Sequence, residues 1–190
     1  MPKILVFAGS TRNDSFNRKL ARQAAEAFQR AGLATTLAEL RDYPMPMYDG
    51  DLETTSGLPE RAKAFKELVR GHDILVIASP EYNGSFPALI KNVIDWISRA
   101  EAGEKPGAVF RGKSAALLST SPGSSGGKRG LKHLRELFEY LGIAVLPEQL
   151  NVPKSFQAFD SQGKLVRPED IEALDQIVAK IATEPQPAAA

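Results

Sequence analysis

The chain has 190 residues and no cysteine, which excludes disulfide bonds, thiolate catalysis, and thiolate-ligated zinc or iron–sulfur sites. Its 24 Lys and Arg residues nearly balance its 23 Asp and Glu residues, so the net charge of +1 supplies no field to hold nucleic acid or a membrane surface. We therefore expect small-molecule or protein partners, and a redox role would require a bound cofactor.

The start of the chain carries an apolar run, residues 4–8, that is too short for the core of a signal peptide. No apolar run reaches membrane-spanning length. We expect a cytoplasmic protein with a single domain over residues 1–183. Residues 184–190, with two prolines and three terminal alanines, are expected to form a flexible tail.

Short apolar runs alternate with longer stretches of helical spacing along the chain. This alternation predicts an α/β fold, a doubly wound five-stranded parallel sheet with helices on both faces. We expect strands at residues 3–9, 35–40, 73–79, 114–119 and 143–146, the last either stopping there or continuing past Pro147 to Val152. Helices are expected at residues 16–31, from Pro59, at 87–99, at 128–141 and from Pro168. Residues 42–57, rich in Pro, Gly, Asp and Met, are expected to form an irregular loop.

The first of three unusual loops, residues 9–17, lies between a buried strand and the start of a helix, where unpaired backbone N–H groups collect. Ligands of doubly wound sheets bind beyond such strand ends. Polar side chains that could hold a phosphate without a metal belong to Ser10, Thr11, Arg12, Ser15 and Asn17. The alternative is an ordinary turn with Ser15 as the N-cap. The loop matches neither a dinucleotide fingerprint nor a P-loop.

The second loop, residues 79–87, follows the most apolar strand and combines prolines, an aromatic, an amide and a glycine. It can offer a flat apolar surface with backbone polar groups at its edge, which suits a planar heteroaromatic ring. The alternative, about equally favoured by local chemistry, is a turn in which Tyr82 and Phe86 only cover the core.

The third loop, residues 120–128, has small side chains and much exposed backbone. It can approach a ligand closely and direct N–H groups at a developing negative charge. A flexible linker would have a similar composition. Its position between a strand and a helix within the domain favours the binding interpretation.

Together these loops resemble those of the NAD(P)H-dependent FMN reductases, a flavodoxin-like family that includes quinone, azo-dye and chromate reductases. The resemblance rests on residues 9–17, on 79–85 with 91–96, and on the Gly/Ser loop at 121–127. It covers most of the chain, and the sequence departs from the family's commonest form mainly in the third loop and after Val152, where there is no sharp match. It implies a flavodoxin-like fold and FMN as the cofactor.

By this resemblance, the residues around the FMN phosphate would be Ser10, Arg12, Ser15, Phe16 and Asn17. Those along the edge and face of the isoalloxazine ring would be Pro80, Glu81, Tyr82, Asn83 and Gly84. Those near its pyrimidine end would be Ser121, Gly123, Gly126 and Gly127. No catalytic side chain and no metal ligand is expected, because the flavin carries the hydride chemistry.

The implied function is an oxidoreductase in which NADPH or NADH reduces FMN. Electrons then pass by a ping-pong mechanism to a small acceptor, which would be a quinone, a free flavin, an azo compound or a metal oxyanion. The alternative is an FMN-binding electron-transfer protein with little nicotinamide reactivity. Such carriers usually have strongly charged surfaces, so the nearly neutral chain favours the reductase.

Family members are usually dimers or tetramers, so the resemblance implies a homodimer or homotetramer. The helix with Trp96 would contribute either to that interface or to the core. His72 and His133 have no metal-ligand spacing and are expected at the surface or at a helix end. A basic cluster, formed by Lys128, Arg129, Lys132 and Arg135, indicates either a solvated face or a site for nicotinamide nucleotide phosphates.

Overall fold

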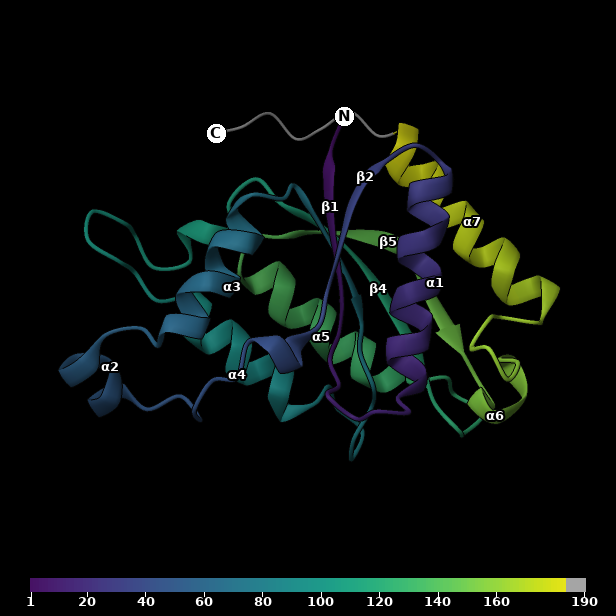
Figure 1. Cartoon of the computed structure of the whole chain (residues 1–190), viewed down its shortest axis with the longest axis horizontal. Helices are drawn as coiled ribbons and strands as arrows, with labels where there is room; N and C mark the ends of the chain where they lie inside the picture. The colour runs from purple at the N-terminus through teal and green to yellow at the C-terminus, as the bar shows by residue number, and fades with distance from the viewer. Residues whose placement is uncertain (184–190) are drawn as a thin grey trace.

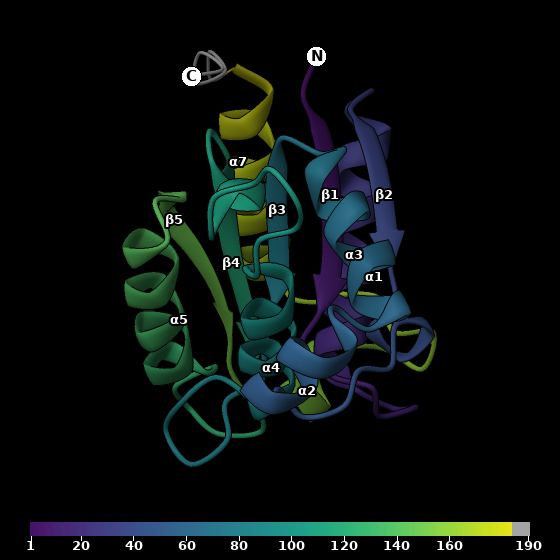
Figure 2. The same cartoon turned by 90° about the vertical axis from the view of Figure 1, so that its left-hand side faces the viewer.

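A computed structural model of the protein describes residues 1–183. Its five strands form one parallel sheet in the order β2-β1-β3-β4-β5. Figure 2 shows this order across the view. The strands are β1 (Lys3–Ala8), β2 (Ala34–Ala38), β3 (Ile74–Ala78), β4 (Ser114–Thr120) and β5 (Ala144–Val152). Every neighbouring pair is parallel, which confirms the predicted doubly wound sheet.

The helices cover both faces of the sheet, with α1 and α7 on one side and α3, α4 and α5 on the other (Figure 1). They are α1 (Phe16–Arg30), α2 (Gly50–Ser56), α3 (Glu60–Arg70), α4 (Ala88–Ile97), α5 (Lys128–Tyr140), α6 (Ser155–Ala158) and α7 (Pro168–Thr183), with short 3-10 turns at η1 (Leu40–Asp42) and η2 (Ala108–Phe110). The predicted helices are therefore present, with boundaries that differ by one or two residues.

The core has two layers because the central strands are buried on both faces. Ile4 and Val6 of β1 pack in the layer of α1 and α7, whereas Leu5 and Phe7 pack in the layer of α3, α4 and α5. A strand covered on both faces needs apolar residues at successive positions. This explains why the strand signals are continuous apolar runs and not alternating patterns.

The prediction that residues 42–57 form only an irregular loop is wrong in its second half, which contains α2. Asp49 is the N-cap of this helix, and its carboxylate accepts hydrogen bonds from the N–H groups of Asp51 (2.8 Å) and Leu52 (3.4 Å). A side-chain acceptor at this position satisfies backbone donors that a short helix cannot satisfy itself. The short α6 was also not predicted.

The last strand continues past Pro147 to Val152, the longer of the two alternatives. Its pairing with β4 shifts register between Ala115 and Leu117, so Pro147 lies at an irregularity of the ladder. β5 is also an edge strand, where a residue without an N–H is tolerated.

The predicted tail at 184–190 lies outside the described residues. Within the described part of the chain, no helix has the length and apolar character to cross a membrane.

Candidate functional site

The three unusual loops meet at the carboxyl edge of the sheet because they follow β1, β3 and β4, which are adjacent strands. This edge lies at the bottom of Figure 1, near α6. Backbone hydrogen bonds join the strand ends, from the N–H of Gly9 to the carbonyl of Ala78 (2.9 Å) and from the N–H of Ser79 to that of Leu118 (2.8 Å). The three loops predicted from sequence therefore lie next to one another at this edge.

The first loop presents unpaired donors. The N–H groups of Thr11, Asn13 and Asp14 make no hydrogen bond within residues 1–183, and the exposed guanidinium of Arg12 has no partner there. Ser15 is the N-cap of α1, and its Oγ accepts a hydrogen bond from the N–H of Arg18 (3.4 Å). Ser15 thus caps the helix as the ordinary-turn interpretation expects, while the donors around it stay available for an anion.

Two arginines that sequence reasoning missed donate hydrogen bonds to backbone carbonyl groups of this loop. The buried Arg18 donates from Nη1 to the carbonyls of Arg12 (3.0 Å) and Asn13 (3.1 Å). The exposed Arg41 donates to the carbonyl of Thr11 (2.8 Å) and to Asn13 Oδ1 (3.1 Å). The arginines therefore fix the loop backbone through its carbonyls, while the N–H groups of Thr11, Asn13 and Asp14 have no partner within residues 1–183.

The side chain of Asn17 links the first loop to the third. Its Nδ2 donates to the carbonyl of Thr120 (2.9 Å), and its Oδ1 accepts from the N–H of the same residue (3.0 Å). One N–H of this buried amide therefore has no partner within residues 1–183. Ser10 is buried, and its Oγ accepts from the N–H of Arg12 (3.4 Å). Phe16 packs against Phe159, with ring centroids 5.7 Å apart.

A cavity of about 270 Å³ opens beside the start of α1. Two cations, Arg12 and Lys19, line it together with one carboxylate, that of Asp14. Ser155 at the start of α6 also lines it, and its buried Oγ has no hydrogen-bond partner in the described structure. The cavity thus has net positive charge and unused polar groups, which suit a phosphate.

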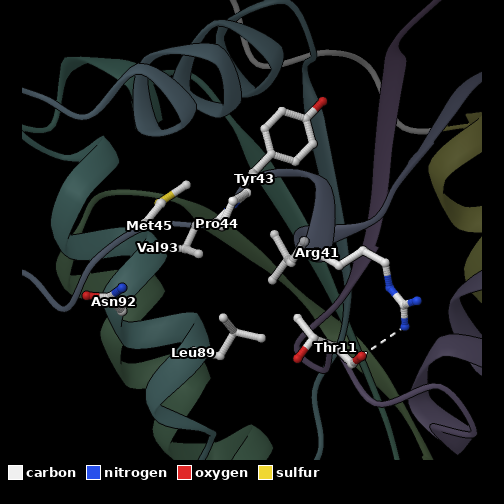
Figure 3. A pocket seen from close by; sticks show the side chains of 9 residues that line it. Thr11, Arg41, Tyr43, Pro44, Met45, Leu89, Asn92 and Val93 are labelled. Atoms are coloured by element: carbon white, nitrogen blue, oxygen red, sulfur yellow. Dashed lines mark hydrogen bonds between the residues drawn. The ribbon is translucent and has the colours of Figure 1, made fainter.

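A second cavity, of about 330 Å³, lies on the other face of the sheet and is shown in Figure 3. Thr11, Tyr43, Met45, Leu89 and Val93 are among the residues that line it, so its wall is mostly apolar. The first loop therefore has a basic cavity on the α1 side and an apolar cavity on the α4 side.

Trp96 belongs to the core. It is fully buried, and its Nε1 donates to the carbonyl of Pro46 (2.8 Å). Asn92, one turn earlier on α4, donates to the same carbonyl (2.9 Å) and accepts from the N–H of Tyr48 (2.7 Å). Of the two predicted roles for Trp96, the structure supports packing within the chain, where it fixes the segment that borders the cavity of Figure 3.

The second loop contains a tight turn closed by two hydrogen bonds between Tyr82 and Ser85, at 2.9 and 3.0 Å. Its central residues, Asn83 (φ 52°) and Gly84 (φ 78°), both have positive φ, as a type I′ turn requires. The Tyr82 side chain is 49% exposed, and the N–H groups at the tip have no partner within the described residues. The loop therefore offers both an aromatic surface and free backbone donors.

Glu81 connects the second loop to α5. Its carboxylate accepts a hydrogen bond from the N–H of Gly130 (2.9 Å), a donor in the first turn of that helix. A carboxylate at this point satisfies an otherwise unpaired N–H and interacts favourably with the helix dipole. The resemblance implies that Glu81 lines the ring, and the structure adds a capping role that sequence reasoning missed.

The third loop is fixed by segments that follow β5. The carbonyl of Ser121 accepts from the N–H of Ser155 (3.0 Å), and that of Gly123 accepts from the N–H of Lys154 (3.1 Å). By contrast, the N–H groups of residues 123–127 make no hydrogen bond within the described chain. This anchoring argues against a flexible linker and leaves a row of backbone donors available.

Neither histidine lies in a metal-binding arrangement. His72, directly after α3, is buried and makes hydrogen-bond contacts with the carbonyl of Leu68 (2.6 Å) and Oγ1 of Thr36 (2.8 Å). The exposed His133 lies 3.2 Å from Ser85 Oγ. Across residues 1–183, no group of three or more His, Cys, Asp or Glu side chains could hold a metal ion.

The groups at this edge fit FMN, the predicted cofactor. A phosphate monoester needs several donors and a cation, which the first loop supplies through free N–H groups and Arg12. A planar ring with polar edges needs an aromatic neighbour and backbone donors, which the second and third loops supply. Each part of the cofactor therefore has a matching set of groups.

Comparisons with known proteins agree with this fit. A family model described as NADPH-dependent FMN reductase matches residues 2–157. An NAD(P)H-dependent FMN reductase of Pseudomonas aeruginosa is 35% identical over 175 residues, which cover 92% of this chain and 90% of that protein. A quinone reductase of Escherichia coli K12 is 33% identical over 174 residues, which cover 92% of this chain and 86% of that protein. Among solved structures, the flavoenzyme NAD(P)H:(acceptor) oxidoreductase FerB of Paracoccus denitrificans matches with a TM-score of 0.76 and 26% identity, covering 95% of this chain and 94% of that one.

Proposed function

Because the chain belongs to the family of NADPH-dependent FMN reductases, we propose that it passes electrons from its FMN to a small quinone in a ping-pong cycle. The chain is an oxidoreductase with FMN as cofactor and a nicotinamide nucleotide as electron donor. One observation carries the proposal: three loops at one edge of the sheet each contain backbone N–H groups that have no partner within residues 1–183. The quinone is the acceptor in the name of the E. coli relative.

In this function the first loop binds the phosphate of FMN. Arg12 and the free N–H groups of Thr11, Asn13 and Asp14 neutralise and orient it. Arg18 and Arg41 act indirectly, because they bind carbonyl groups of the loop and so fix its backbone. The N-terminal end of α1 adds the partial positive charge of its dipole.

The second and third loops orient the ring system. The edge and face of the ring would be held by Tyr82 and the N–H groups at Asn83 and Gly84, which have no partner within residues 1–183. Its pyrimidine end would be held by the N–H groups of residues 123–127. When bound, FMN supplies the chemistry by accepting a hydride and passing electrons onward. Preorganised N–H groups near the ring stabilise the negative charge that reduction produces.

The acceptor is small in this proposal, with free flavins, azo compounds and metal oxyanions as alternative substrates. We also propose that the protein is cytoplasmic and forms a homodimer or homotetramer, as the family resemblance implies. A pure electron carrier is the second candidate. The net charge of +1 does not favour it, because carriers usually meet their partners through strongly charged surfaces.

The experiment combines cofactor binding with steady-state kinetics. Purified protein reconstituted with FMN should bleach anaerobically when NADPH or NADH is added and recover its colour when benzoquinone follows. Double-reciprocal plots at several quinone concentrations should be parallel, as a ping-pong cycle requires. Intersecting lines would overturn the ping-pong step, and a protein that binds no FMN would overturn the whole proposal.

The variant Arg12→Ala tests the phosphate assignment. We expect its FMN dissociation constant to rise about tenfold or more, because a charge-assisted hydrogen bond to the phosphate is lost. Arg61→Ala, which removes an exposed arginine on α3, is the matched control. If both variants retain flavin equally through extensive dialysis, Arg12 does not hold the phosphate.

A further inference from the structure

A basic groove lies along α5 and the edge strand β5, outside the three loops. Its volume is about 420 Å³. Four cationic side chains line it, with no carboxylate among its lining residues, which are Ser125, Lys128, Arg129, Lys132, Arg135 and Gln149. We call it the α5 groove.

The cations of the α5 groove are arranged for an external anion. Lys128, Lys132 and Arg135 are spaced i, i+4 and i+7, so they share one stripe of the helix, where like charges repel. Lys128, Arg129 and Lys132 are exposed and form no ion pair within the described residues. Their charges are therefore available to a ligand and would be stabilised by one.

Arg135 is held in place by the fold. Its guanidinium donates to the carbonyl of Leu146 (2.7 Å) and lies 3.7 Å from a carboxylate oxygen of Glu139. It thereby joins α5 to the first part of β5. The groove thus has one fixed guanidinium and three cations that are free to close on an anion.

The α5 groove adjoins the loops that we assign to the flavin ring. Ser125 of the third loop lines it, and α5 begins directly after that loop. The second loop contacts the same helix, through the bond from Gly130 to Glu81 and the contact between His133 and Ser85. A nucleotide whose nicotinamide reaches the flavin can therefore extend its other end toward the groove.

We propose that the α5 groove binds the adenosine 2′-phosphate of NADPH and so gives the enzyme a preference for NADPH over NADH. This inference rests on the proposed function. The 2′-phosphate carries close to two negative charges and occurs only in NADPH, so a cluster of free Lys and Arg side chains discriminates between the two donors. The aliphatic stems of these side chains provide an apolar wall for the adenosine.

The test compares the double variant Lys128→Ala/Lys132→Ala with the wild type. We expect the ratio of kcat/KM for NADPH to that for NADH to fall about tenfold or more, because two charge-assisted contacts to the 2′-phosphate are lost. Calorimetric titration with 2′,5′-ADP should show binding to the wild type and at least tenfold weaker binding to the variant. The control Arg61→Ala/Lys63→Ala, two exposed cations of α3, should leave both measurements unchanged.

Three results would overturn the assignment. Equal losses with NADPH and NADH would mean that the groove binds the pyrophosphate that both donors share. If the ratio of kcat/KM for NADPH to that for NADH and the affinity for 2′,5′-ADP are both unchanged, the α5 groove does not bind the electron donor. A change in the oligomeric state of the variant, measured by sedimentation, would identify the groove as an interface between copies of the chain. Because 2′,5′-ADP titration needs no turnover, binding there without any NAD(P)H oxidation would support the groove while contradicting the proposed reductase.

Discussion

Arg18 and Glu39 form a bidentate ion pair, from Nε to Oε2 at 2.7 Å and from Nη2 to Oε1 at 2.9 Å. The pair joins the first turn of α1 to the end of β2. The third guanidinium nitrogen of Arg18 binds the carbonyls of Arg12 and Asn13, so the pair also fixes the loop that we assign to the FMN phosphate. We therefore expect cofactor affinity and fold stability to be coupled through this side chain.

Replacing Arg18 with alanine should weaken both properties. It removes the donors to two loop carbonyls and leaves Glu39, whose side chain is 24% exposed, without its main partner. We expect the free energy of unfolding to fall by about 2 kcal/mol, since a largely buried pair is broken on one side. The FMN dissociation constant should rise about tenfold, because the phosphate loop loses its preorganisation. Urea unfolding and FMN fluorescence titration measure the two effects.

Arg22→Ala is the matched control for this prediction. Arg22 contacts the same carboxylate at 3.3 Å from an exposed position on α1. An exposed pair of this kind contributes about 0.5 kcal/mol or less, and Arg22 makes no bond to the phosphate loop. If the two alanine variants lose the same stability and the same FMN affinity, Arg18 has no special role.

Replacing Arg41 with alanine should change the rate of FMN dissociation without changing the stability of the fold. Arg41 is exposed, and its two hydrogen bonds go to the carbonyl of Thr11 and to Asn13 Oδ1. Its loss should increase the FMN dissociation rate about fivefold, equivalent to losing one modest hydrogen bond, with little change in the unfolding midpoint. Stopped-flow displacement of FMN measures the rate. An unchanged rate would show that the first loop keeps its shape without Arg41.

The ionisation of Glu39 should make stability depend on pH in acid. Burial raises the pKa of this carboxyl, but hydrogen bonds and charge from Arg18, with a smaller effect from Arg22, outweigh burial and lower it. Because the pKa is lower in the folded state than in the unfolded state, ionised Glu39 stabilises the fold above its unfolded pKa. That stabilisation is lost as the pH falls through the folded value.

The comparison of wild type with Glu39→Gln tests whether ionised Glu39 stabilises the fold above its unfolded pKa and loses this effect in acid. The difference in unfolding free energy should be largest near neutral pH and should shrink once the pH falls below about 4, the ordinary range of a glutamate. Urea titrations across the acid range measure it. A difference that stays constant or grows on acidification would mean that the ion pair does not lower the pKa of Glu39.

Local signals in the sequence predicted much of the fold and the three loops that meet at the candidate site. The sequence predicted a loop at residues 79–87 without a turn type, and the structure adds that Asn83 and Gly84 both have positive φ, which is typical of this pair. The continuous apolar runs at β1 and β3 predicted buried strands, and the structure shows that both strands contribute residues to the two core layers. These features depend on residues close together in the sequence, so the sequence alone indicates them.

The supporting contacts could not be predicted because their partners are far apart in the sequence. Glu39 is 21 residues from Arg18, Glu81 is 49 residues from Gly130, and Thr120 is 103 residues from Asn17. Each pair meets only after the strands take their order in the sheet. The identity of a charged or amide residue does not indicate which distant group in the fold it will bind.

The last prediction concerns the third loop, where two glycines should respond differently to alanine. Gly126 has φ 59°, and a Cβ there would lie 2.9 Å from the backbone carbonyl carbon of Asn151 and from the N of Val152. Backbone cannot move aside cheaply, and the left-handed conformation adds about 1 kcal/mol for a residue with a Cβ. Gly123→Ala meets nothing closer than Ser121 Oγ at 3.9 Å. We therefore expect Gly126→Ala to lower the thermal midpoint by about 4 °C or more, and Gly123→Ala to leave it unchanged.

The same pair of variants also tests where the flavin lies. If Gly123 borders the ring, its new methyl group should raise the FMN dissociation constant while the apoprotein unfolds at the wild-type temperature. Thermal unfolding of the apoproteins and FMN titration separate the two effects. Wild-type FMN affinity in Gly123→Ala would remove this residue from the ring site, and wild-type stability in Gly126→Ala would mean that the loop can shift away from β5. Because Gly126 packs on β5 and Gly123 lies in the exposed part of the loop, only the first substitution should disturb the fold.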